Sequence, residues 1–227
     1  MLKPFPLANY LLCHALVTEF RQGFGLPINT IVEHTSKPLH DSLHFEELLE
    51  LVDSNNLVER LDALGDLVYV IFGRIVESGI KDFEQFKTLM PEYMSWLSYI
   101  NAIADHIIER HIENANHIGN EVDGHTTHID LGKADTVFMK IFKAIHQSNM
   151  TKLCKEDETQ PTQEYYFAKG IETYKTLTSG GLFAIKVFKD NSTSNLPFGK
   201  VLKNINYKSV SIPEAFSAAL REIESPL

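Results

Sequence analysis

The sequence predicts an all-α fold, an antiparallel helical bundle of about five helices with a small C-terminal β-hairpin. Three observations favour it. Apolar residues recur at helical spacing over most of residues 8–147. Glycine and proline separate these periodic stretches, as they do at helix ends. Only residues 182–189 alternate in the manner of a strand.

The helical stretches have recognisable ends. Gly23 and Gly25 stop the first, Gly79 stops the third, and Pro91 suits the start of the fourth. The predicted helices cover residues 8–23, 41–52, 57–78, 91–116 and 134–147, with a short helical turn at 82–89 and a polar loop at 119–132.

The pattern changes after Lys155. Residues 156–161 read as a polar loop and residues 164–177 as a short helix. Residues 182–189 predict a strand, 190–195 a turn, and 200–203 a returning partner strand. We therefore expect one domain over residues 1–227, with a helical elaboration at 81–132 and a mixed C-terminal extension at 155–227.

Composition narrows the class of protein. The chain has 227 residues, of which 44% are hydrophobic, enough for a substantial core. A net charge of -9 argues against a nucleic-acid partner, which would need basic patches. No apolar run approaches a membrane span, and the N-terminus lacks a signal-peptide core. A cytoplasmic protein with no membrane partner is the expectation.

Six carboxylates mark the second and third predicted helices: Glu46, Glu47, Glu50, Glu59, Asp62 and Asp66. At about 100° per residue, the first three fall within roughly 100° of one another and the last three within roughly 60°. The connection between the helices is short, which makes them antiparallel neighbours. Both acidic stripes can then face one cleft.

Asp66 lies in a stretch that is apolar nearly all round its helix, as in a buried helix. A buried carboxylate needs a partner to offset its desolvation. Several converging carboxylates cannot satisfy one another while ionised, but a hard divalent cation can satisfy them all. The pattern therefore predicts a site for Mg²⁺ or Mn²⁺.

Other interpretations of these residues remain open. Exposed acidic residues at helical spacing often form only a solvated face. Glu59 has the spacing of a capping box with Asn56. Asp62 could instead form an ion pair with Arg60 or Arg74.

Three segments together resemble a known superfamily. They are E-E-L-L-E at 46–50 with L-D-A-L-G-D-L-V-Y-V at 61–70, H-Q-S-N-M-T-K-L at 146–153, and F-G-K-V-L-K-N-I-N-Y at 198–207. The first resembles the all-α nucleoside triphosphate pyrophosphohydrolases, which include MazG-type enzymes, dimeric dUTPases and phosphoribosyl-ATP pyrophosphohydrolase. The other two are similar to segments of the phosphoribosyl-ATP-pyrophosphohydrolase-like branch.

The resemblance implies hydrolysis of a nucleoside triphosphate between the α- and β-phosphates, as in nucleotide-pool house-cleaning. It implies that Glu46 holds a further ion or acts as base on the attacking water, with help from Glu59. The implied ligands of Mg²⁺ or Mn²⁺ are Glu47, Glu50, Asp62 and Asp66. The implied substrate-binding residues are Asn149, Lys152, Lys200, Lys203 and Tyr207.

Two departures from the family pattern keep alternatives open. The MazG-type motif would require a carboxylate at Ala63, whereas here it lies at Asp62, as in a D-A-L-x-D variant. Smaller relatives also lack residues 81–132. The alternatives are phosphoribosyl-ATP pyrophosphohydrolase proper, in histidine biosynthesis, a non-catalytic nucleotide-binding relative, and a structural helical protein with an acidic face.

The helix from Pro91 carries a broad aromatic stripe around Trp96 and Tyr99. One chain would not cover such a stripe, and large apolar patches usually mark partner surfaces. Members of the resembled family also build sites from helical bundles that form between chains. We therefore expect a homodimer or homotetramer.

Overall fold

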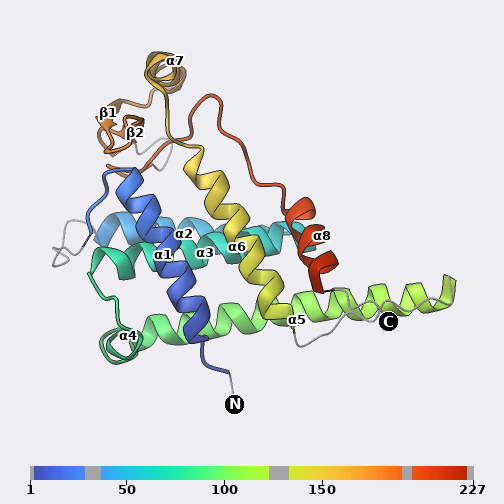
Figure 1. Cartoon of the computed structure of the whole chain (residues 1–227). Helices are drawn as coiled ribbons and strands as arrows, with labels where there is room; N and C mark the ends of the chain where they lie inside the picture. The colour runs from blue at the N-terminus through green and yellow to red at the C-terminus, as the bar shows by residue number, and fades with distance from the viewer. Residues whose placement is uncertain (1–2, 29–36, 123–132, 191–195, 224–227) are drawn as a thin grey trace.

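The computed structural model describes residues 3–28, 37–122, 133–190 and 196–223 (Figure 1). Within them it is mainly helical with one small antiparallel sheet, as predicted, but it has eight helices rather than about five. The elements are α1 (Leu7–Gly23), α2 (Lys37–Asp53), α3 (Leu57–Glu77), α4 (Phe83–Leu89), α5 (Pro91–Val122), α6 (Ala134–Met150), α7 (Glu156–Phe167), β1 (Thr173–Leu177), β2 (Phe183–Val187) and α8 (Ile212–Ile223). Among the described helices, none is both long and apolar enough to cross a membrane.

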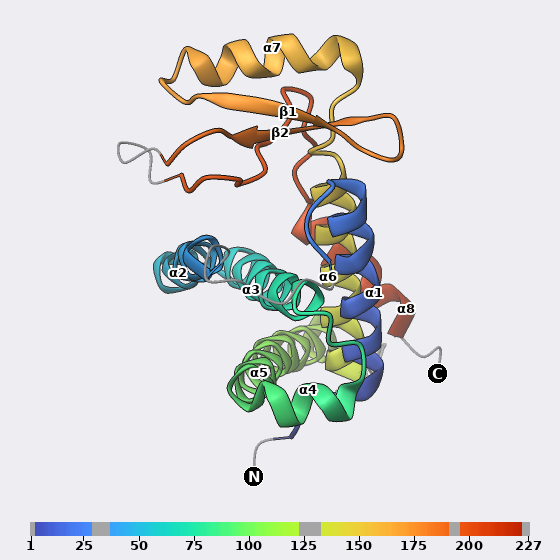
Figure 2. The ribbon, with the colours of Figure 1, turned by 90° about the vertical axis from the view of Figure 1, so that its left-hand side faces the viewer.

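The helices form two crossing layers (Figures 1 and 2). The neighbours α1 and α6 cross α3, while α2 runs along α3 and α5 packs beneath it. The core between the layers is aromatic and aliphatic, with Tyr10, Phe72 and Phe138 fully buried. Gly65 allows α3 to approach α6 closely, because a Cβ atom there would lie 2.2 Å from Ile145 Cδ1. The site helix α3 is therefore fixed against α6 next to Asp66.

A buried ion-pair network fixes the start of α2. The Glu77 carboxylate, at the end of α3, accepts a hydrogen bond from Arg21 Nη2 at 3.0 Å and lies 2.5 Å from His40 Nε2. All three side chains are buried. Removing one member would leave a buried charge uncompensated, which is strongly destabilising. The network joins α1, α2 and α3, and so sets the position of the first three carboxylates.

Residues 154–207 form a module that we call the α7–β module. Its helix α7 covers one face of the sheet, in which Thr173 pairs with Val187 and Leu177 with Phe183. The module has a hydrophobic cluster separate from the main core, made of Cys154, Ile171, Ile185, Val187 and Leu202. It stacks over the ends of α1 and α6, and over α2 and α3 (Figure 2).

The structure corrects the C-terminal prediction. The polar loop expected at 156–161 is the first half of α7, and the helix expected at 164–177 ends at Phe167 and gives way to β1. Capping explains the early start, since Glu158 Oε2 accepts a hydrogen bond from the Lys155 backbone at 2.7 Å. Residues 200–203 do contact β2, but through an isolated bridge at Val201, while β1 is the partner strand.

Several element ends also differ from expectation. Helix α2 begins at Lys37, four residues early, α6 continues to Met150, and α8 was not predicted. Helix α5 extends to Val122, into the expected loop 119–132, whose remaining residues lie outside the described ones. Residues 191–195 of the expected turn also lie outside the description.

Candidate functional site

A cleft of about 470 Å³ lies along α2 and α3, which are antiparallel neighbours as predicted. Four of the six predicted carboxylates line it. The lining residues are Phe45, Glu46, Leu49, Glu50, Asp53, Ser54, Glu59, Asp62, Ala63 and Leu196. The short connection after Asp53 is what brings the two acidic stripes to one cleft.

Glu47 and Asp66 do not line this cleft, but they interact electrostatically with carboxylates that do. Burial raises the pKa of Glu47 well above its usual value, and the charges of Asp66, Glu50 and Glu46 raise it further. Burial likewise raises the pKa of Asp66, with Asp62 as the largest charge effect. The carboxylates are thus close enough to repel one another, as the sequence pattern predicts.

Among the six predicted carboxylates, two have a buried oxygen without a hydrogen-bond partner, Glu47 Oε2 and Asp62 Oδ1. Neither Arg60 nor Arg74 therefore satisfies that oxygen of Asp62. Orphaned buried acceptors are rare in folded proteins and call for an explanation such as an ion. Burial raises the pKa of both carboxyl groups, because it disfavours their charged forms.

Three lysines lie near these carboxylates. Lys152 follows α6, while Lys200 and Lys203 belong to the chain after β2. The Lys200 ammonium donates a hydrogen bond to the Glu46 carboxylate. Burial lowers the pKa of Lys152, and the nearby Asp66 charge opposes that change. Lys200 therefore contacts one predicted carboxylate, and the charges of Lys152 and Lys203 act on Asp66.

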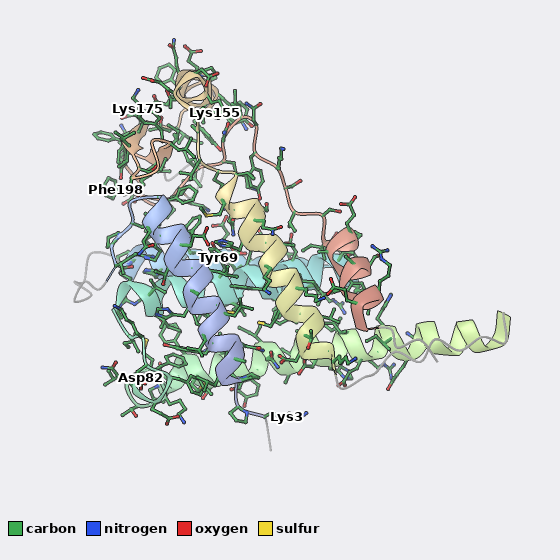
Figure 3. All side chains as sticks on the ribbon, in the orientation of Figure 1. Lys3, Tyr69, Asp82, Lys155, Lys175 and Phe198 are labelled. Atoms are coloured by element: carbon green, nitrogen blue, oxygen red, sulfur yellow. The ribbon has the colours of Figure 1, made fainter. Side chains whose placement is uncertain are left out.

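The remaining two predicted substrate-binding residues lie close by. Asn149 is buried near the end of α6. The Tyr207 hydroxyl contacts Ser148 Oγ at 2.8 Å, and Ser148 Oγ donates to the Lys208 carbonyl at 2.8 Å. Tyr207 therefore ties the segment that carries Lys200 and Lys203 to α6. In Figure 3, Phe198 of this segment is labelled between the sheet and the helices.

Glu59 fits both of its interpretations. Its backbone N–H donates to Asn56 Oδ1 at 3.0 Å, so Asn56 caps α3. Its carboxylate accepts from the Asn55 N–H at 2.7 Å and also lines the cleft. The capping contacts are present, and the catalytic role remains a prediction.

The chemistry of the predicted ligands suits a hard cation, but their side chains are not arranged around a common point. The donors are all carboxylate oxygens, the ligands that Mg²⁺ and Mn²⁺ prefer. Among the described residues, however, no group of three His, Cys, Asp or Glu side chains is arranged to hold a metal ion. Binding would require side chains such as the partly exposed Glu46 and the exposed Glu50 to turn inward.

Sequence reasoning missed two features of the site. One is the apolar side of the cleft, formed by Phe45, Leu49 and Leu196. The spacing of Phe45 and Leu49, one helical turn apart beside the acidic residues, was an available signal. The other is a buried contact of 3.0 Å between the Tyr69 hydroxyl and His146 Nδ1, one turn beyond Asp66. Tyr69 is labelled between α1 and α6 in Figure 3.

Comparisons with known proteins agree with the geometry. Residues 17–90 match the family described as phosphoribosyl-ATP pyrophosphohydrolase, a segment that contains all six carboxylates. An uncharacterised protein of Acanthamoeba polyphaga mimivirus is 28% identical over 239 residues, covering 85% of this chain and 90% of that protein. No solved structure matches the chain significantly. The resemblance predicted for the acidic helices is thereby confirmed over residues 17–90, and it supports hydrolase activity of the pyrophosphohydrolase type in general terms.

Proposed function

We propose that this protein hydrolyses a nucleoside triphosphate, or a related nucleotide, between the α- and β-phosphates. The products would be a nucleoside monophosphate and pyrophosphate. The observation that supports this most is a cleft lined by carboxylates, within the segment that matches the pyrophosphohydrolase family. Lys200 donates a hydrogen bond to one of them, Glu46, and the charges of Lys152 and Lys203 act on the neighbouring Asp66. Carboxylates suit bound cations, and lysines suit the outer phosphates.

Glu47, Glu50, Asp62 and Asp66 would hold Mg²⁺ or Mn²⁺. When bound, the ion would neutralise phosphate charge and lower the pKa of a water molecule. The orphaned oxygens of Glu47 and Asp62 are the acceptors most in need of such a partner. The ion would thus remove an energetic cost that the folded chain carries by itself.

Glu46 is suited to take the proton from the attacking water. In the free protein its carboxylate is held by Lys200. A triphosphate entering the cleft would compete for that ammonium, and transfer of Lys200 to a phosphate would release Glu46. Lys200 therefore links the arrival of substrate to the availability of the base.

The test is product analysis with a panel of ribo- and deoxyribonucleoside triphosphates and with phosphoribosyl-ATP, in Mg²⁺. We expect release of pyrophosphate with the matching monophosphate. Release of orthophosphate and a nucleoside diphosphate would show cleavage between the β- and γ-phosphates and would contradict the proposal. Turnover of phosphoribosyl-ATP alone would favour the histidine-biosynthesis alternative, and no turnover would favour a binding or structural role.

Removing a lysine should weaken catalysis without disturbing the carboxylates. Loss of one charge-assisted contact costs on the order of 1.5–3 kcal/mol, or roughly ten- to a hundred-fold in kcat/KM. We expect this decrease for Lys152→Ala and Lys203→Ala in steady-state kinetics, with cation affinity close to that of the unmodified protein. The exposed Lys208→Ala is the matched control. Unchanged kinetics in both test variants would show that these lysines only shape the surface.

We also propose that the protein assembles as a homodimer or homotetramer. Trp96, Tyr99 and Ile103 form an exposed apolar stripe along α5, which one chain leaves uncovered. Sedimentation at micromolar concentration should therefore give a mass at least twice the 25.8 kDa of the chain. Tyr99→Glu should shift the protein toward the monomer. A monomer in the unmodified protein would contradict the proposal.

A further inference from the structure

We propose that Phe45, Leu49 and Leu196 form a nucleobase subsite in which the base of the substrate stacks on the Phe45 ring. We call these three residues the apolar wall. The inference rests on the proposed function, because it names the residues that would bind the base of the nucleotide, whereas the lysines account only for its phosphates.

The apolar wall lines an open cleft. Phe45 is 59% exposed and Leu49 is 45% exposed, and both line the cleft together with Leu196 of the α7–β module. The cleft volume of about 470 Å³ lies within the range of roughly 300–1,000 Å³ that is typical of small-molecule sites. Such sites place apolar walls beside polar groups, and here the apolar wall adjoins the acidic residues.

The chemistry of the lining favours a heteroaromatic ring. Phosphates and cations gain nothing from apolar side chains, so the acidic residues alone do not account for the wall. A nucleobase offers an apolar face for stacking and edge N–H groups for hydrogen bonding. The cleft supplies an aromatic ring for the face and carboxylates that only accept hydrogen bonds for the edge.

The position of the apolar wall also fits a nucleotide that reaches the lysines. Phe45 and Glu46 are consecutive on α2, about 100° apart round the helix. Glu46 binds Lys200, and Leu196 lies four residues before Lys200 in the same segment. A base on Phe45 would therefore lie next to Glu46, the cleft residue that binds Lys200.

The same helix provides a matched control. Val52 lies seven residues after Phe45, so it projects on nearly the same side of α2, and it is 78% exposed. It does not line the cleft. A general loss of exposed apolar surface would affect Val52→Ala and Phe45→Ala alike, whereas a base subsite concerns Phe45 alone.

The experiment is calorimetric binding of the four common ribonucleoside monophosphates and of base-free ribose 5-phosphate. The proteins are the unmodified chain, Phe45→Ala, Phe45→Tyr and Val52→Ala. We expect Phe45→Ala to weaken the tightest monophosphate by about five- to a hundred-fold, the range for losing one base–aromatic stack. Phe45→Tyr and Val52→Ala should bind it normally, and ribose 5-phosphate should not distinguish the proteins.

Two results would overturn the subsite. One is unchanged affinity of Phe45→Ala for every monophosphate, and the other is an equal loss for ribose 5-phosphate. If Phe45→Ala instead alters sedimentation while nucleotide affinity stays normal, Phe45 belongs to an interface between chains and the proposal is wrong.

This result can be told apart from failure of the proposed function. Base-dependent binding through Phe45 without any pyrophosphate release would support the subsite and refute the hydrolase proposal. Pyrophosphate release that is equally efficient in Phe45→Ala would support the hydrolase and refute the subsite.

Discussion

Asp66→Asn is expected to reduce pyrophosphate release to background while the helical fold survives. Asp66 is half-buried, and its pKa is raised by burial and by the charges of Asp62 and Glu50, while the charge of Lys152 opposes the rise. Asparagine has nearly the same shape, so it preserves the close packing of α3 on α6 beside Gly65. It removes the anionic oxygen on which the proposed cation binding depends, and whose charge opposes the lowering of the Lys152 pKa by burial.

The same change should not destabilise the protein in metal-free buffer. The pKa of Asp66 is raised, first by burial, so desolvation and repulsion outweigh the help from the lysines. Removing an incompletely compensated charge is then neutral or stabilising. Circular dichroism melting should show a midpoint equal to that of the unmodified chain or higher.

Asp53→Asn is the control for Asp66→Asn. Asp53 lines the cleft but lies outside the predicted ligand set, so its loss should leave substantial activity. If Asp66→Asn keeps activity near that of the unmodified protein, the ligand assignment is wrong. If both variants lose activity equally, activity depends on the total negative charge of the cleft rather than on particular metal ligands.

The sequence predicts the elements whose signals are local. Helix α3 has its cap at Asn56 and its stop at Gly79, where φ is 77° and glycine is the residue that adopts it freely. The segment 164–177 was predicted wrongly because β1 is stabilised by pairing with β2, which is a non-local contact. Helix α7 was missed because its polar first half and Pro161 resemble a loop. Its acidic first turn nevertheless stabilises the helix despite Pro161.

The same distinction holds for the candidate site. The acidic cleft follows from helical spacing and a short connection, both readable in the chain. The pairing of Lys200 with Glu46 joins residues 154 positions apart, and only resemblance to a family suggested that they share a site. Leu196 reaches the cleft for the same tertiary reason, so the spacing on α2 could reveal Phe45 and Leu49 but not Leu196.

Removing divalent cations is expected to abolish activity completely and reversibly. Glu47 Oε2 and Asp62 Oδ1 are buried without hydrogen-bond partners, although the charges of nearby lysines partly offset those of the carboxylates. That leaves a repulsive site whose charges an ion would balance. EDTA should eliminate pyrophosphate release, and excess Mg²⁺ or Mn²⁺ should restore it.

Cation binding should also be visible without turnover. An ion that binds only the folded state stabilises it by about 2.7 kcal/mol at a hundred times its Kd. The melting midpoint should therefore rise in Mg²⁺ relative to EDTA, and the rise should be smaller in Asp66→Asn. Potassium chloride at matched ionic strength is the control for simple screening of the carboxylates. Full activity in chelator, or an equal rise in potassium chloride, would mean that the carboxylates act without a bound ion and that Lys152, Lys200 and Lys203 supply the positive charge.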